Sequence, residues 1–170
     1  MRRWLVWCCC GWLIWLTGCQ AVTDENAAPV TTGFSCEAAI RYKDMDITGL
    51  LTRSGAGTLS LEFLSPDTLK GIVATWDGEK VTASLYGMSI DLPPDTLPAS
   101  ALGSALTEAL DAAFLAPEQG QLTEEGFRWE GVGPNGTMVL LTDPEDGSLR
   151  SLSLPQIPLT VSFSRFKLSS

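Results

Sequence analysis

Apolar and polar residues alternate along most of the chain after residue 33, in short runs separated by turn-forming residues. In the first run, Phe34, Cys36, Ala38 and Ile40 fall on one face, and mostly polar residues lie between them. A period of two is the period of a β-strand that buries one face and exposes the other. Because short turns join strands that run in opposite directions, this pattern predicts an antiparallel sheet with one apolar face.

Turn signals separate the runs. Asp77-Gly78 is a strong hairpin signal, since both positions of its tight turn favour positive φ. Ser65-Pro66-Asp67 predicts a connection with one helical turn, because Ser can cap a helix and Pro suits its first position. The alternation predicts strands over 34–43, 47–53, 59–63, 72–76, 81–85, 88–92, 122–131, 137–142, 148–154 and 159–168.

One segment, from about residue 100 to residue 115, has a different period: apolar side chains recur there every three or four positions. This pattern predicts a helix with an apolar stripe, which Pro117 and Gly120 end. The apolar stripe must be buried against another element, and the apolar face of the predicted sheet is the obvious partner. We therefore expect an α+β fold: one large curved antiparallel β-sheet, a half-barrel, packed on at least one helix.

The first residues have the layout of a secretory signal. Arg2 and Arg3 precede an apolar run over 4–16, and small residues follow it. The run is too short for a comfortable membrane span, which needs about 20 residues. Leu16-Thr17-Gly18-Cys19 resembles the bacterial lipobox, and this resemblance implies acylation of Cys19 and cleavage before it. An uncleaved signal anchor, with Cys19 as an incidental thiol, is the alternative.

These features predict three parts: a lipoprotein signal peptide over 1–18, a flexible tether over 19–32 that begins with lipidated Cys19, and a single domain over 33–170. The expected location is the cell membrane, with the lipid-anchored domain facing the extracytoplasmic side. After lipidation Cys36 is the one remaining thiol. Its place in the first strand predicts a small core residue; a reactive thiol is the alternative.

Charge and composition exclude several functions. Cleavage after residue 18 leaves nine basic side chains against twenty acidic ones, a formal charge of −11. Such a chain repels polyanions, so we expect no nucleic-acid partner. The absence of histidine excludes histidine-dependent catalysis and removes the commonest metal ligand. No two carboxylates stand out as an acid/base pair, and the 143–146 loop does not have the spacing of a known calcium loop. We therefore expect no enzyme, cofactor or metal.

The run over 57–91 resembles the lipoprotein-carrier superfamily typified by LolA, LolB and the mycobacterial LppX/LprG group. In those proteins, a strand that ends in a proline-containing corner precedes a strand, an Asp-Gly hairpin and another strand. The matching residues here are Leu59-Ser60-Leu61-Glu62-Phe63-Leu64-Ser65-Pro66 and Trp76-Asp77-Gly78-Glu79-Lys80-Val81. The resemblance implies an incomplete barrel closed by helices, with an apolar cavity for the acyl chains of lipids or lipoproteins.

If this fold holds, the inward apolar residues are candidates to line a cavity. For each of them the core interpretation is favoured over ligand contact, since a sheet must bury its apolar face with or without a ligand. The candidates are Leu59, Leu61, Phe63, Ile72, Trp76, Leu85, Met88 and Ile90 from the sheet, and Leu106, Leu110 and Phe114 from the helix.

Two functions remain open. The first is a membrane-anchored extracytoplasmic lipoprotein that binds or carries a lipid, a lipoprotein or another hydrophobic ligand in the cell envelope. The alternative is a non-enzymatic structural or protein-interaction domain of the cell surface with a filled core. The sequence does not identify a protein partner.

Overall fold

The computed structural model describes residues 33–55, 57–78, 80–92, 98–115, 120–133 and 136–168. The predicted signal peptide, the predicted tether and Cys19 lie outside these ranges. Within them, no helix is both long enough and apolar enough to cross a membrane.

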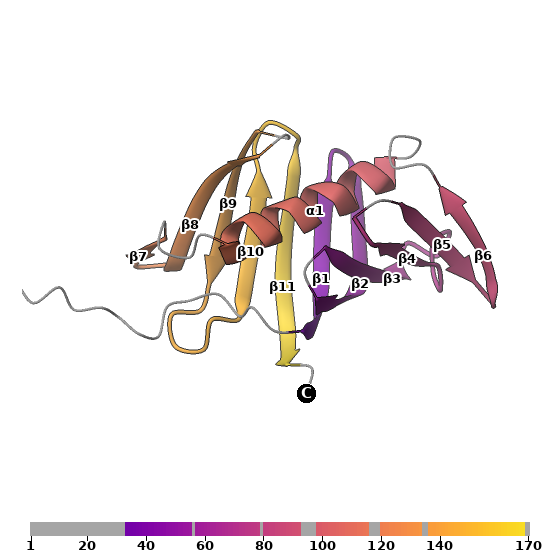
Figure 1. The fold of residues 1–170 in the computed structure, drawn as a ribbon, viewed down its shortest axis with the longest axis horizontal. Coiled ribbons are helices and arrows are strands. Elements are labelled where there is room, and N and C mark those ends of the chain that lie inside the picture. Colours follow the sequence, from indigo (N-terminus) through magenta and orange to yellow (C-terminus); the bar gives the residue numbers. More distant parts are fainter. Residues whose placement is uncertain are drawn as a thin grey trace, which may run out of the picture.

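Figure 1 shows an open, curved sheet with a long helix across its concave face. The elements are β1 (Phe34–Tyr42), β2 (Met45–Gly55), β3 (Thr58–Ser65), β4 (Val73–Trp76), β5 (Val81–Leu85), β6 (Met88–Leu92), α1 (Pro98–Leu115), β7 (Gln121–Thr123), β8 (Gly126–Gly133), β9 (Gly136–Thr142), β10 (Leu149–Leu154) and β11 (Leu159–Leu168). The predicted α+β class, with a large curved antiparallel sheet packed on a helix, is confirmed, and the sheet does not close into a barrel.

The strand order explains the position of the helix. The sheet has the order β6-β5-β4-β3-β2-β1-β11-β10-β9-β8-β7, so β1–β6 and β7–β11 are two meanders joined where β1 pairs with β11. The chain must therefore cross from the β6 edge to the β7 edge, and α1 makes this crossing (Figure 1). Its 18 residues span about 27 Å, whereas eleven strands laid flat span about 48 Å. The helix thus covers only part of the concave face.

The core fills the space between α1 and the inward face of the sheet. Curvature brings the helix backbone close to β8 and β9 at one end and to β3 and β4 at the other, and large side chains fill the deeper middle. The largest fully buried side chains are Phe34, Ile40, Leu51, Leu59, Leu61, Leu106, Leu110, Met138, Leu140, Leu152, Leu154 and Leu159. All of them lie between residues 33 and 168, so this part of the chain has a hydrophobic core of its own and is expected to fold alone.

Three local predictions were wrong. The predicted strands over 34–43 and 47–53 leave Asp44-Met45-Asp46 as the turn between them. The turn lies instead at Lys43 and Asp44, because Lys43 takes the left-handed conformation (φ 53°) and β2 begins at once at Met45. The connection after Ser65 forms consecutive turns, with hydrogen bonds from Leu69 N–H to Pro66 O and from Ile72 N–H to Leu69 O, and contains no helical turn.

The third error is the single strand predicted over 122–131, which is a hairpin of β7 and β8. The turn ends at Gly126, whose φ of 137° suits glycine and few other residues. The hydroxyl of Thr123 donates a hydrogen bond of 2.7 Å to the Gly126 carbonyl and closes the turn.

Cys36 points inward from β1, as predicted for a core residue, and is 1% exposed. Burial raises the pKa of its thiol to about 12, so the thiol stays protonated at neutral pH. Because the thiolate is the reactive form, we expect folded 33–170 to resist iodoacetamide at pH 8 and to react fully in denaturant. Mass spectrometry of the alkylated chain checks this. Rapid alkylation without denaturant would mean that β1 opens locally.

Candidate functional site

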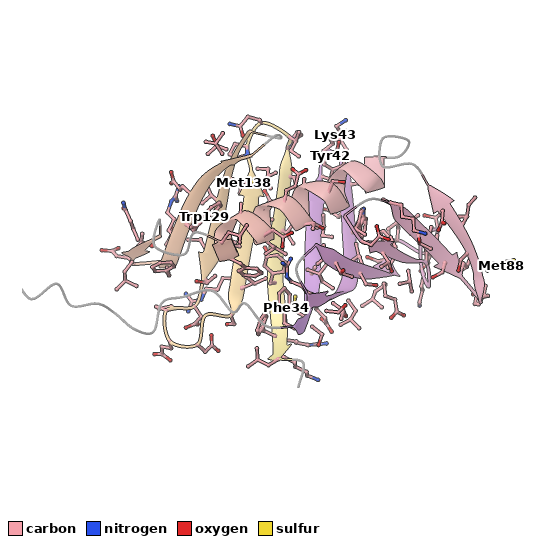
Figure 2. All side chains as sticks on the ribbon, viewed as in Figure 1. Phe34, Tyr42, Lys43, Met88, Trp129 and Met138 are labelled. Carbon is pink, nitrogen blue, oxygen red and sulfur yellow. The ribbon has the colours of Figure 1, made fainter. Side chains whose placement is uncertain are left out.

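Among the residues that the structure describes, the inward side chains at the β5–β6 end of the concave face are partly exposed. The inward residues there are Ala83 and Leu85 on β5, paired with Ile90 and Met88 on β6. Cross-strand partners share one face of a sheet, so these four side chains continue the apolar face that forms the core. We call them the open strip. Ala83 and Leu85 are half-buried, whereas Ile90 is 60% exposed and Met88 is 71% exposed. Figure 2 shows Met88 at the far edge of the sheet, away from α1.

The predicted cavity residues fall into two groups. Those in the core or packed against it are Leu59, Leu61, Phe63, Ile72, Trp76, Leu106, Leu110 and Phe114. The other three, Leu85, Met88 and Ile90, belong to the open strip. The fold brings each group together, but the side chains of the first group fill the space beneath the helix. Any hydrophobic ligand therefore has its most direct access at the strip.

A buried ion pair holds the helix on the sheet. Arg53 points inward from β2, is 2% exposed, and forms an ion pair with the carboxylate of Asp111 on α1. The same carboxylate accepts a hydrogen bond of 3.2 Å from the Gly57 backbone N–H. The guanidinium of Arg53 also lies 4.8 Å from the ring centre of Phe114. Sequence reasoning missed this group, although Arg53 stands two residues after Leu51 and so shares its inward face.

A second tight contact, at Gly103, fixes the N-terminal half of α1 on the sheet. A Cβ atom added to Gly103 would lie only 1.6 Å from the indole of Trp76, so the ring lies directly against the helix backbone. Next to this contact, a cavity of about 90 Å³ separates α1 from the β4–β5 hairpin. Ligand pockets are commonly about 300 Å³ or larger, so this cavity is too small to enclose an acyl chain.

The convex face is polar. Hydroxyl side chains cover much of it and bond across neighbouring strands, as between Thr48 and Ser65 (2.7 Å) and between Ser60 and Thr75 (3.3 Å). Such a face is well solvated and offers little to a hydrophobic molecule. Leu50 and Leu64 are isolated exposed apolar side chains on this face, whereas Met88 and Ile90 lie on neighbouring residues of one inward row at the open strip.

The loop considered for calcium uses its carboxylates within the turn. Asp143 accepts hydrogen bonds from the Glu145 backbone N–H and the Arg150 guanidinium, which lower the pKa of its carboxyl group. Asp146 accepts one from the Ser148 backbone N–H. Within the ranges that the structure describes, no group of three or more His, Cys, Asp or Glu side chains could hold a metal ion.

Comparisons with known sequences give no family. No family model matches the chain. No curated protein matches it either.

The fold has counterparts among solved structures. An uncharacterized conserved protein from Thermus thermophilus is 16% identical, with a TM-score of 0.51, over 83% of this chain and 81% of that one. A LolA superfamily protein from Nitrosomonas europaea is 11% identical, with a TM-score of 0.41, over 86% and 90%. A chain from the complex of the CwlD amidase from Clostridioides difficile with the GerS lipoprotein is 17% identical, with a TM-score of 0.49, over 81% and 87%. By fold, the chain is similar to the uncharacterized Thermus protein.

Proposed function

We propose that the protein is a lipoprotein, anchored to the cell membrane through acylated Cys19, whose extracytoplasmic domain binds the acyl chain of a lipid or lipoprotein on the open strip. The observation that carries this proposal is the exposure of Met88 and Ile90 on the same face that elsewhere forms the core. Large apolar side chains grouped on an exposed face commonly mark an interaction site. The role is non-enzymatic.

The dimensions of the strip suit part of one chain lying along the sheet. The strip covers three residues of each strand, about 10 Å, which is shorter than a medium acyl chain. Each buried CH₂ contributes about 0.8 kcal/mol, so a chain covered on one side binds reversibly. An open strip therefore suits exchange between the domain and the membrane better than permanent storage.

A filled interior favours a second function. Because the core beneath α1 is packed and the adjoining cavity is small, the domain can also serve as a structural or protein-interaction module of the cell surface. In that case the strip would contact a protein. The two functions differ in whether an isolated domain takes up lipid.

Native mass spectrometry of residues 33–170, before and after organic extraction, tests the proposal together with titration of a fluorescent acyl probe. We expect an extractable lipid or saturable probe binding. The double variant Met88→Ser/Ile90→Ser should weaken probe binding about tenfold, since it removes two large apolar contacts. Val132→Ser is the matched control: Val132 is 85% exposed and alternates with buried Trp129, so it lies on the other face. A domain without lipid that ignores the probe would contradict lipid binding and favour the protein-interaction module.

A further inference from the structure

The outer edge of β6 has no partner strand among the residues that the structure describes. β6 pairs with β5 alone and ends one side of the sheet (Figure 1). Both φ angles of the Tyr86-Gly87 turn, 50° and 81°, are positive, as in a type I′ hairpin. The closing pair of such a hairpin, here Leu85 and Met88, exchanges hydrogen bonds, and so does every second pair after it. The N–H and C=O groups of Ser89 and Asp91 therefore point away from β5, toward the open edge.

The β6 edge lacks most of the features that keep sheet edges apart. Natural edge strands are commonly very short, charged, bulged or interrupted by proline. β7, at the opposite edge, is such a strand, because it has three exposed residues and Glu124-Glu125 follows it. β6 has five residues without proline, and its pairing with β5 has no register shift. Its one charged side chain, Asp91, bonds to Lys80 (3.0 Å) and Thr82 (2.8 Å), so β6 repels a second strand less than β7 does.

β6 is complementary to a second copy of itself. When two antiparallel β6 strands are centred on Ile90, all five residues of each strand have a partner. Ser89 of each copy then lies opposite Asp91 of the other, and the outward N–H and C=O groups of these residues bond to one another. The hydroxyl of Ser89 also lies beside a carboxylate that can accept its hydrogen bond. Pairing centred on Ser89 or Asp91 instead would leave part of each strand without a partner.

We propose that two copies of this chain pair edge to edge through β6 and join their open strips into one apolar surface. Partners across a ladder share one face, so Met88 and Ile90 of both copies lie on the concave side. The strip of one copy is shorter than a medium acyl chain, and the two strands of the second copy add about 10 Å of width. Acyl binding on the joined surface rests on the proposed function, whereas the pairing itself does not. A pairing of five residues buries little area, so we expect a weak, reversible dimer.

Sedimentation equilibrium of residues 33–170 over a range of concentrations tests the pairing. We expect the average mass to rise toward that of two chains as the concentration increases. Ser89→Pro removes an outward N–H without touching the hydrogen bonds to β5, and should raise the dissociation constant by at least about tenfold. Ser89→Ala keeps this N–H and is the matched control. Ser89→Asp leaves the backbone unchanged but places a like charge opposite Asp91 of the second copy, so it should weaken the dimer most at low salt.

Binding of the fluorescent fatty acid cis-parinaric acid separates this inference from the proposed function. We expect the dimeric wild type to bind this probe more tightly than Ser89→Pro does. A chain that stays monomeric at every concentration, with and without the probe, would overturn the inference, and acyl binding would then stand on a single strip. Dimers that persist in both Ser89→Pro and Ser89→Asp would also overturn it, because the interface would lie elsewhere.

Two further outcomes concern the joined surface. Equal probe binding by the wild type and Ser89→Pro would overturn the joined surface. If the dimer forms and is lost in Ser89→Pro, but no variant binds the probe, the proposed function fails and the pairing through β6 stands. Cooperative thermal unfolding of every variant is verified first.

Discussion

Asp111→Ala is expected to lower the free energy of unfolding by about 2–4 kcal/mol, because it leaves Arg53 charged and buried without its partner. The side chain of Arg53 is 3% exposed and that of Asp111 is 28% exposed, so the loss is somewhat smaller than for a fully buried pair. The Gly57 backbone N–H also loses its acceptor. Urea unfolding of 33–170, followed by circular dichroism, measures the change.

A double variant and a surface control test whether this loss comes from the unpaired, buried charge of Arg53. Arg53→Met/Asp111→Leu should recover most of the stability, since apolar residues often replace a buried ion pair at little cost. Asp46→Ala breaks the exposed pair with Arg41, whose side chains are 74% and 75% exposed, and should cost less than about 1 kcal/mol. Equal losses for Asp111→Ala and Asp46→Ala would show that the buried pair does not hold the helix on the sheet.

Much of the fold could be predicted from the sequence, because burial of one face imposes a period of two. The run from Phe34 to Ile40 is buried at every second residue, as its alternation indicated. The β7–β8 hairpin could not be found in this way. A strand of three residues shows no period, and all three residues of β7 are exposed.

The candidate site was harder to predict, because alternation shows which residues point inward but not which of them α1 covers. The inward residues of β3 and β6 have the same local pattern, yet Leu61 is fully buried and Ile90 is mostly exposed. The difference arises because α1 is shorter than the sheet is wide, so α1 covers Leu61 but not Ile90. Trp76 and Thr107 line one cavity although they are distant in the sequence, so no local pattern could join them.

At Gly103 we expect a glycine-to-alanine substitution to lower stability, the reverse of its usual effect in a helix. In a helix interior, alanine is normally more stable than glycine by about 1 kcal/mol. Here the added Cβ would lie 1.6–2.2 Å from atoms of the Trp76 indole, so the helix or the ring must move. We therefore expect Gly103→Ala to destabilise the domain by about 1–3 kcal/mol, the usual cost of overpacking. The midpoint of urea unfolding reports the sign directly.

The background variant Trp76→Leu separates overpacking from any other cost at this position. Leucine leaves room beside the helix, so Gly103→Ala in this background should become neutral or stabilising, as helix propensity alone predicts. The difference between the two backgrounds measures the coupling between the helix and β4. If Gly103→Ala stabilised the wild-type chain, Trp76 would not pack closely on α1. The part of the concave face that α1 covers would then also be wrong.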